Sequence, residues 1–154
     1  MLPFAHIAAA YLLWRFLGLF FPADTASLLL AVFFGVFLDG DVIFKPSEHR
    51  ASPFHSLVPW IMFIVLLYCI GFKYWWTALF GLLHLSLDMI DWSIYIFYPL
   101  TRRTIGLRLY ERVSNLTVGE NSLGEFLLEY MKNRYFMSAE IALSILAIIV
   151  SIFF

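Results

Sequence analysis

Five long apolar stretches dominate this sequence and limit what it can fold into. They cover residues 3–21, 26–44, 54–72, 74–98 and 136–154. A helix that crosses the roughly 30 Å of bilayer hydrocarbon needs about 20 mostly apolar residues, so each stretch is long enough to span. The pattern predicts one all-α membrane domain, residues 1–154, with five transmembrane helices. A cytoplasmic amphipathic segment, residues 99–135, is expected between the fourth and fifth helices.

Composition supports a membrane protein and excludes several other classes. Hydrophobic residues make up 62% of the 154 residues and charged residues 14%, whereas a soluble domain carries roughly 45–50% and about 25%. Too few polar side chains remain to cover a water-facing surface. The formal net charge of -1 gives no indication of nucleic-acid binding, and we expect no such partner. The single cysteine, Cys69, excludes a disulfide framework and a Cys-based zinc site.

The distribution of lysine and arginine predicts the orientation in the membrane. With five spans, the N-terminus and the 45–53 and 99–135 loops lie on one side and carry eight basic residues, against Lys73 alone on the other side. Cytoplasmic loops carry the excess of basic residues. We therefore expect a multi-pass protein of the cell (inner) membrane with a cytoplasmic N-terminus, and leave its oligomeric state open.

Titratable residues inside or beside the apolar stretches give the clearest indication of function, because such groups are costly in a membrane. Seven of them would gather in the cytoplasmic leaflet: His6, Asp39, Asp41, His49, His55, His84 and Asp88. Imidazole nitrogens and carboxylate oxygens are ligands of zinc, manganese and iron. We therefore expect these residues to bind one or two divalent ions, with zinc as the first choice.

The spacing of His84 and Asp88 places them on one face of a helix, and Asp91 continues that face. A pair of this kind could also be a structural hydrogen bond. Asp91 could be a ligand, could orient a histidine or could pair with an arginine. Gly40, between Asp39 and Asp41, lets the backbone bend at the end of the second stretch.

Short motifs follow one another along residues 1–105. They are Phe4-Ala-His6-Ile7, Leu38-Asp-Gly-Asp41, His49-Arg50 followed by His55-Ser56-Leu57, His84-Leu-Ser-Leu-Asp88, and Tyr98-Pro-Leu-Thr-Arg102-Arg103. In this order they resemble the membrane-bound metal-dependent hydrolases, a family of inner-membrane enzymes. The resemblance implies a membrane-embedded hydrolase that acts through a metal-activated water. Because the expected site lies in the cytoplasmic leaflet, we expect its substrate to be a lipid or lipid-linked (phospho)ester.

The same resemblance implies roles for further residues. Asp91 or Asp41, whichever is not a metal ligand, would act as the general base. Arg50, Arg102 and Arg103 would bind the substrate, because arginine forks bind phosphate oxygens in pairs. These three arginines also fit a positive-inside loop that has no role in substrate binding.

Two other classes of function fit the same residues. Intramembrane histidines and aspartates also build proton relays, so a proton- or ion-coupled transporter is one alternative. The other is a membrane scaffold in which a structural metal, closed off from water, holds the helices together.

Overall fold

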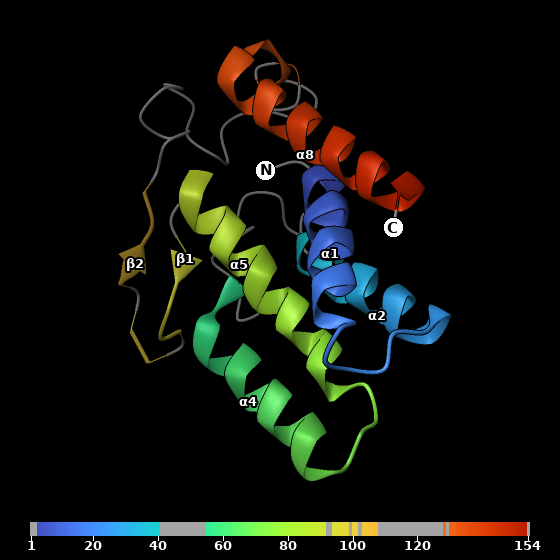
Figure 1. Cartoon of the computed structure of the whole chain (residues 1–154). Coiled ribbons are helices and arrows are strands. Elements are labelled where there is room, and N and C mark those ends of the chain that lie inside the picture. The colour runs from blue at the N-terminus through green and yellow to red at the C-terminus, as the bar shows by residue number, and fades with distance from the viewer. Residues whose placement is uncertain are drawn as a thin grey trace.

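The computed structural model describes residues 3–40, 55–91, 94–98, 100, 101, 103–107, 128 and 130–153, which are mostly helical (Figure 1). The elements in chain order are α1 (Pro3–Leu17), α2 (Thr25–Val36), the 3₁₀ helix η1 (Phe37–Gly40), α4 (Leu57–Cys69), the 3₁₀ helix η4 (Trp75–Ala78), α5 (Leu79–Asp91), β1 (Ile94–Tyr95), β2 (Thr104–Ile105) and α8 (Arg134–Phe153). Most of the 99–135 segment lies outside the described residues.

The prediction of five transmembrane helices is wrong. Within the described part of the chain, α8 is the one helix that is long and apolar enough to cross a membrane. Helices α1, α2, α4 and α5 have 12 to 15 residues. At 1.5 Å per residue they are about 18–23 Å long, well short of the roughly 30 Å that a span must cover.

Local backbone chemistry shortens these helices. Helix α1 ends at Leu17, and Asp24 then caps α2. The Asp24 carboxylate accepts a hydrogen bond from the Ser27 backbone N–H at 2.8 Å, and the Ser27 hydroxyl accepts one from the Asp24 N–H at 2.9 Å. This capping box satisfies backbone donors that would otherwise lack partners at the start of the helix. The chain turns again after α4, where Gly71 adopts a φ of 69°.

The fourth apolar stretch contains three conformations instead of one helix. It forms η4 and α5, and the chain then enters a short hairpin in which β1 pairs antiparallel with β2, Ile94 opposite Ile105. Figure 1 shows this hairpin beside α5. The Ser56 hydroxyl, immediately before α4, donates to the Ile96 carbonyl at 3.0 Å, and the Leu107 N–H donates to the Met89 carbonyl at 2.7 Å. The hairpin is therefore tied to the start of α4 and the end of α5.

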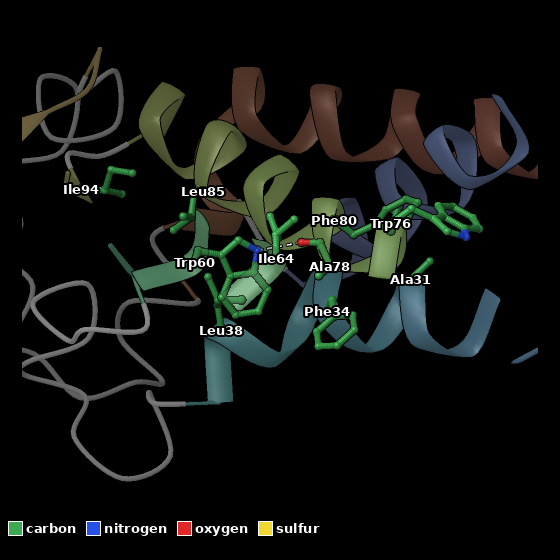
Figure 2. Close-up of a cluster of buried hydrophobic side chains, with 11 residues drawn as sticks. Ala31, Phe34, Leu38, Trp60, Ile64, Trp76, Ala78, Phe80, Leu85 and Ile94 are labelled. Atoms are coloured by element: carbon green, nitrogen blue, oxygen red, sulfur yellow. Dashed lines mark hydrogen bonds between the residues drawn. The ribbon is translucent and has the colours of Figure 1, made fainter. Parts of the chain in front are cut away.

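The apolar core lies between α2, α4, η4 and α5 and is built around Trp60. Figure 2 shows its indole nitrogen directed at the Ala78 carbonyl, to which it donates a hydrogen bond at 2.7 Å. A Cβ at Gly81 would overlap the Trp60 ring, so only glycine leaves room for the indole against α5. This contact sets how closely α4 and α5 approach.

Helix α8 packs across α1 (Figure 1). Phe136 and Glu140 are its buried residues, and the Tyr130 hydroxyl donates to Glu140 Oε1 at 2.9 Å. Only 17% of the most apolar 18-residue segment of α8 is buried. Most of its apolar surface therefore faces away from the rest of the fold.

Candidate metal centre

Four separate segments bring three histidines and two aspartates to one point. His6 comes from α1, Asp39 from η1, His55 from the turn before α4, and His84 and Asp88 from α5. Asp88 lies at the centre, because its two oxygens face all three imidazoles at 3.5–3.7 Å. His84 and Asp88 share a face of α5, as their spacing predicts.

The close approach of α1 and α2 positions the first histidine. A Cβ at Gly35 would lie only 3.0 Å from the Ala10 Cβ and 3.7 Å from the His6 carbonyl oxygen, so a glycine here lets the two helices pack tightly. The His6 ring then stacks on the His84 ring, with centroids 4.0 Å apart and planes inclined by 25°.

Four of these residues form a compact ligand set. One ligand atom each from Asp39, His55, His84 and Asp88 lies within 4.8 Å of the other three. His84 Nε2 is 3.5 Å from Asp39 Oδ1 and 3.6 Å from Asp88 Oδ2, and His55 Nε2 is 3.7 Å from the same Asp88 oxygen. The three imidazoles and Asp88 are almost completely buried, at 0–1% exposure. A cation bound here would therefore be shielded from bulk water.

These distances fit a metal site better than a hydrogen-bonded cluster. Hydrogen bonds between nitrogen and oxygen cluster near 2.7–3.2 Å, and the nitrogen–oxygen distances here are longer. Ligands at 2.0–2.2 Å from a tetrahedrally coordinated ion stand about 3.3–3.6 Å apart. The contacts of Asp88 and Asp39 with His84, at 3.6 and 3.5 Å, agree with that spacing.

The tautomer of His84 leads to the same conclusion. Its Nδ1 lies 2.8 Å from the Gly35 carbonyl oxygen, which can only accept a hydrogen bond, so Nδ1 carries the proton. In the neutral ring, Nε2 then holds a lone pair, and it faces a carboxylate oxygen of Asp39 and one of Asp88. Ionised carboxylates are acceptors too. Only a positive charge, either a proton on Nε2 or a metal ion, can satisfy this arrangement.

The electrostatics of the two stacked histidines differ. Burial is the largest influence on His6 and lowers its pKa, although the contact with Asp88 opposes this. Burial also acts to lower the pKa of His84, but the contact with Asp88, the charges of Asp88 and Asp39 and the Gly35 hydrogen bond together outweigh it and raise that pKa. The negative charge of Asp88 and Asp39, which raises the pKa of His84, would equally attract a divalent cation.

The members of the ligand set are not equally buried. The Asp39 side chain is 15% exposed, whereas the other members of the ligand set are almost completely buried. Asp39, on η1, is therefore the ligand nearest to solvent.

The structure brings together five of the seven residues that the sequence suggests as ligands, and their ligand role stays a prediction. Asp41, His49, Arg50 and Arg102 lie outside the described residues. Asp91 is the last residue of α5, and its side chain is not described. Arg103 is exposed just before β2, and its backbone N–H donates to the Thr101 hydroxyl at 3.3 Å, so it belongs to the hairpin segment and not to the ligand cluster.

Sequence reasoning missed the role of the Gly35 carbonyl. Every residue carries a backbone carbonyl, so no residue type marks the one that will orient a histidine. A glycine inside the apolar Thr25–Val36 helix was a usable indication of close packing, although not of the partner that would approach it.

No protein-family model matches this chain, and no curated protein or solved structure shows significant similarity to it.

Proposed function

We propose that this protein is a metal-dependent hydrolase that acts on a lipid or lipid-linked (phospho)ester. The observation that carries the proposal is the buried Nε2 of His84, which faces an oxygen of each of two aspartates while Nδ1 is held by the Gly35 carbonyl. The order of the short sequence motifs, which resembles that of membrane-bound metal-dependent hydrolases, supports the reaction class.

The donor set fits a divalent cation. Asp39, His55, His84 and Asp88 offer two imidazole nitrogens and two carboxylates, a combination that suits zinc and also manganese or iron. When bound, such an ion supplies Lewis acidity: it polarises a substrate oxygen and lowers the pKa of a water to about 7.

The residues of the chain would supply the remaining steps. The Gly35 carbonyl holds the His84 ring in one orientation, which keeps the ligand geometry fixed during turnover. Asp91 or Asp41 would accept the proton of the attacking water at a carboxylate oxygen. The water oxygen bonds to the ester's phosphorus or acyl carbon, the bond to the leaving oxygen breaks, and that oxygen takes up a proton.

Exposed apolar side chains support a lipid-like substrate. Phe37, in the same 3₁₀ helix as Asp39, is 45% exposed. Further exposed apolar residues cover the outer faces of α1, α2, α4 and α8. Water-soluble substrates would have no use for such a surface, whereas an acyl or prenyl chain would lie against it.

Membrane association is part of the proposal and rests on α8. Helix α8, Arg134–Phe153, is long and apolar enough to cross a membrane. It is also mostly exposed, whereas a core helix of a soluble protein would be mostly buried. We propose that α8 holds the protein at the cell membrane; the cytoplasmic position of the N-terminus remains a prediction.

The partial exposure of Asp39 favours an enzyme over a scaffold with a structural metal. A structural site closes all positions around the ion, whereas a catalytic site keeps one position open. The 15% exposure of Asp39 would let water or a substrate oxygen approach an ion beside this carboxylate, which a fully enclosed structural site would not allow.

Hydrolysis by purified protein tests the proposal. Protein in detergent micelles would be incubated with bis-p-nitrophenyl phosphate and with phosphatidylglycerol, before and after removal of metal with a chelator. We expect turnover that is lost with the chelator and regained with Zn²⁺ or Mn²⁺.

Matched variants of α5 make the test specific. His84→Ala and Asp88→Ala should abolish turnover. Ser86 lies between them on the same helix, and its exposed hydroxyl donates to the Leu82 carbonyl of that helix at 2.7 Å. The Ser86→Ala variant should therefore retain turnover. If His84→Ala and Asp88→Ala retain the same turnover as Ser86→Ala, the proposal is overturned.

A further inference from the structure

The two carboxylates of the cluster each face two ways. Asp88 turns Oδ2 toward His55 and His84, and turns Oδ1 toward His6 Nε2 at 3.5 Å. Asp39 does the same, with Oδ1 at 3.5 Å from His84 Nε2 and Oδ2 at 4.0 Å from His6 Nε2. Each aspartate therefore presents one oxygen to His84 and the other oxygen to His6.

His6 is placed as a ligand and not as a packing residue. Its side chain is 1% exposed, and neither ring nitrogen has a hydrogen-bond partner among the described residues. It is absent from the compact set of four whose ligand atoms lie within 4.8 Å of one another. Its Nε2 faces the second oxygen of each aspartate, at 3.5 Å from Asp88 Oδ1 and 4.0 Å from Asp39 Oδ2, which are longer than ordinary hydrogen bonds and leave room for an ion between them.

Ring geometry shows that His6 and His84 cannot bind one and the same ion. The lone pair of an imidazole nitrogen lies in the ring plane. The His6 and His84 rings are stacked, with planes inclined by 25° and centroids 4.0 Å apart, so an ion in the plane of one ring lies outside the plane of the other. The His55 and His84 planes are inclined by 59°, which allows their lone pairs to converge.

We propose that the cluster is a two-metal centre bridged by both aspartates. One ion is held by His55, His84, Asp39 Oδ1 and Asp88 Oδ2, and the second by His6, Asp39 Oδ2 and Asp88 Oδ1. Two-metal hydrolytic sites hold their ions about 3.5–4 Å apart, a separation that a carboxylate with one oxygen on each ion can bridge. The second ion has only three protein ligands, so it keeps a position open for water or a substrate oxygen.

This inference rests on the proposed function, and a titration with Mn²⁺ tests the two separately. The full chain in detergent, stripped of metal and transferred into chelator-free buffer, would be titrated with Mn²⁺ and followed by electron paramagnetic resonance. Free Mn²⁺ gives a six-line spectrum, and two bound ions about 4 Å apart give a broadened, spin-coupled one. We expect two Mn²⁺ per chain and a coupled spectrum.

Variants assign the two ions. His6→Ala should bind one Mn²⁺ with an uncoupled spectrum, and Ser86→Ala should match the unsubstituted chain. If His6→Ala does not fold, His6→Gln takes its place, and the spectrum of the unsubstituted chain still decides between one ion and two.

The remaining outcomes of the titration distinguish failure of the two-metal centre from failure of the proposed function. One uncoupled Mn²⁺ in the unsubstituted chain, lost in His84→Ala, overturns the two-metal centre and leaves the proposed function intact. Two coupled ions that persist in His6→Ala overturn the role of His6. No binding of Mn²⁺ or of Zn²⁺ overturns the proposed function together with the inference.

Discussion

The His84 imidazole and the Gly35 carbonyl join α5 to α2 by a hydrogen bond of 2.8 Å. The partners are 49 residues apart in the chain, and the bond determines which nitrogen of His84 is available to the site. Because the carbonyl can only accept, the proton stays on Nδ1 and Nε2 faces the aspartates. The ligand geometry therefore depends on the packing of two helices as well as on the ligands themselves.

This hydrogen bond predicts a specific tautomer. In protein loaded with Zn²⁺, ¹⁵N nuclear magnetic resonance should show His84 with a protonated Nδ1 and an unprotonated, metal-bound Nε2. The His84→Gln variant identifies the signals by their loss. A His84 ring that carries its proton on Nε2 would contradict both the Gly35 hydrogen bond and the ligand role of Nε2.

The Asp91 carboxylate should affect turnover more than metal binding. If Asp91 is the general base, Asp91→Asn lowers kcat by about 10²–10⁴-fold, because the amide cannot accept the proton of the attacking water. Metal content should stay unchanged, in contrast to Asp88→Asn, which removes a ligand of the cluster. Unchanged kcat in Asp91→Asn would leave Asp41 as the candidate base, and loss of metal would make Asp91 a ligand.

Gly81 should be intolerant of even one added methyl group. A Cβ there overlaps the Trp60 indole, which is held by its hydrogen bond to the Ala78 carbonyl. Gly81→Ala should therefore destabilise the fold by about 1–3 kcal/mol, the usual cost of overpacking. Thermal unfolding followed by circular dichroism measures this, with Ser86→Ala on the same helix as the control. Equal melting temperatures for the two variants would contradict the close contact of α4 with α5.

Asp24 should make stability depend on acidic pH. The hydrogen bond from the Tyr74 hydroxyl, followed by the bonds from Ser27, lowers the pKa of Asp24 from 3.8 to about 2. A carboxyl whose pKa is lower in the folded state stabilises that state above its unfolded pKa, and the contribution disappears as pH falls from about 4 to about 2.

The Asp24→Asn variant isolates this effect. Asparagine can still cap α2 but has no charge to lose. The melting temperature of the unsubstituted chain should fall more steeply than that of Asp24→Asn between about pH 4 and pH 2. Parallel melting curves across that range would show that Asp24 is not the titrating group.

The membrane architecture could not be predicted from hydropathy, for a physical reason. Hydropathy counts apolar residues and does not count the groups that stop a helix. The Asp24 cap fixes where α2 begins, the positive φ of Gly71 turns the chain after α4, and the pairing of Ile94 with Ile105 places a strand inside the fourth apolar stretch. A stretch of 19 apolar residues can therefore contain a helix of only 12 to 15 residues.

The candidate site was more accessible to sequence reasoning than the fold. The four-residue spacing of His84 and Asp88 needs only helical geometry, which α5 provides. The approach of His6, Asp39 and His55 to this pair depends on tertiary packing. The sequence argument for that approach placed all five residues in one leaflet, and it relied on five transmembrane helices that the structure does not contain. The five residues do meet, because Gly35 brings α1 to α2 and the Gly81–Trp60 contact brings α4 to α5.

The metal content of the purified chain tests the existence of the metal centre most directly. Protein purified in detergent without chelator would be analysed by plasma mass spectrometry beside the His84→Ala, Asp88→Ala double variant and Ser86→Ala. We expect one to two equivalents of zinc, manganese or iron in the unsubstituted chain and in Ser86→Ala, and none in the double variant. Metal retained in the double variant, or absent from all three proteins even after incubation with Zn²⁺ or Mn²⁺, would contradict the assignment of this cluster as a metal centre.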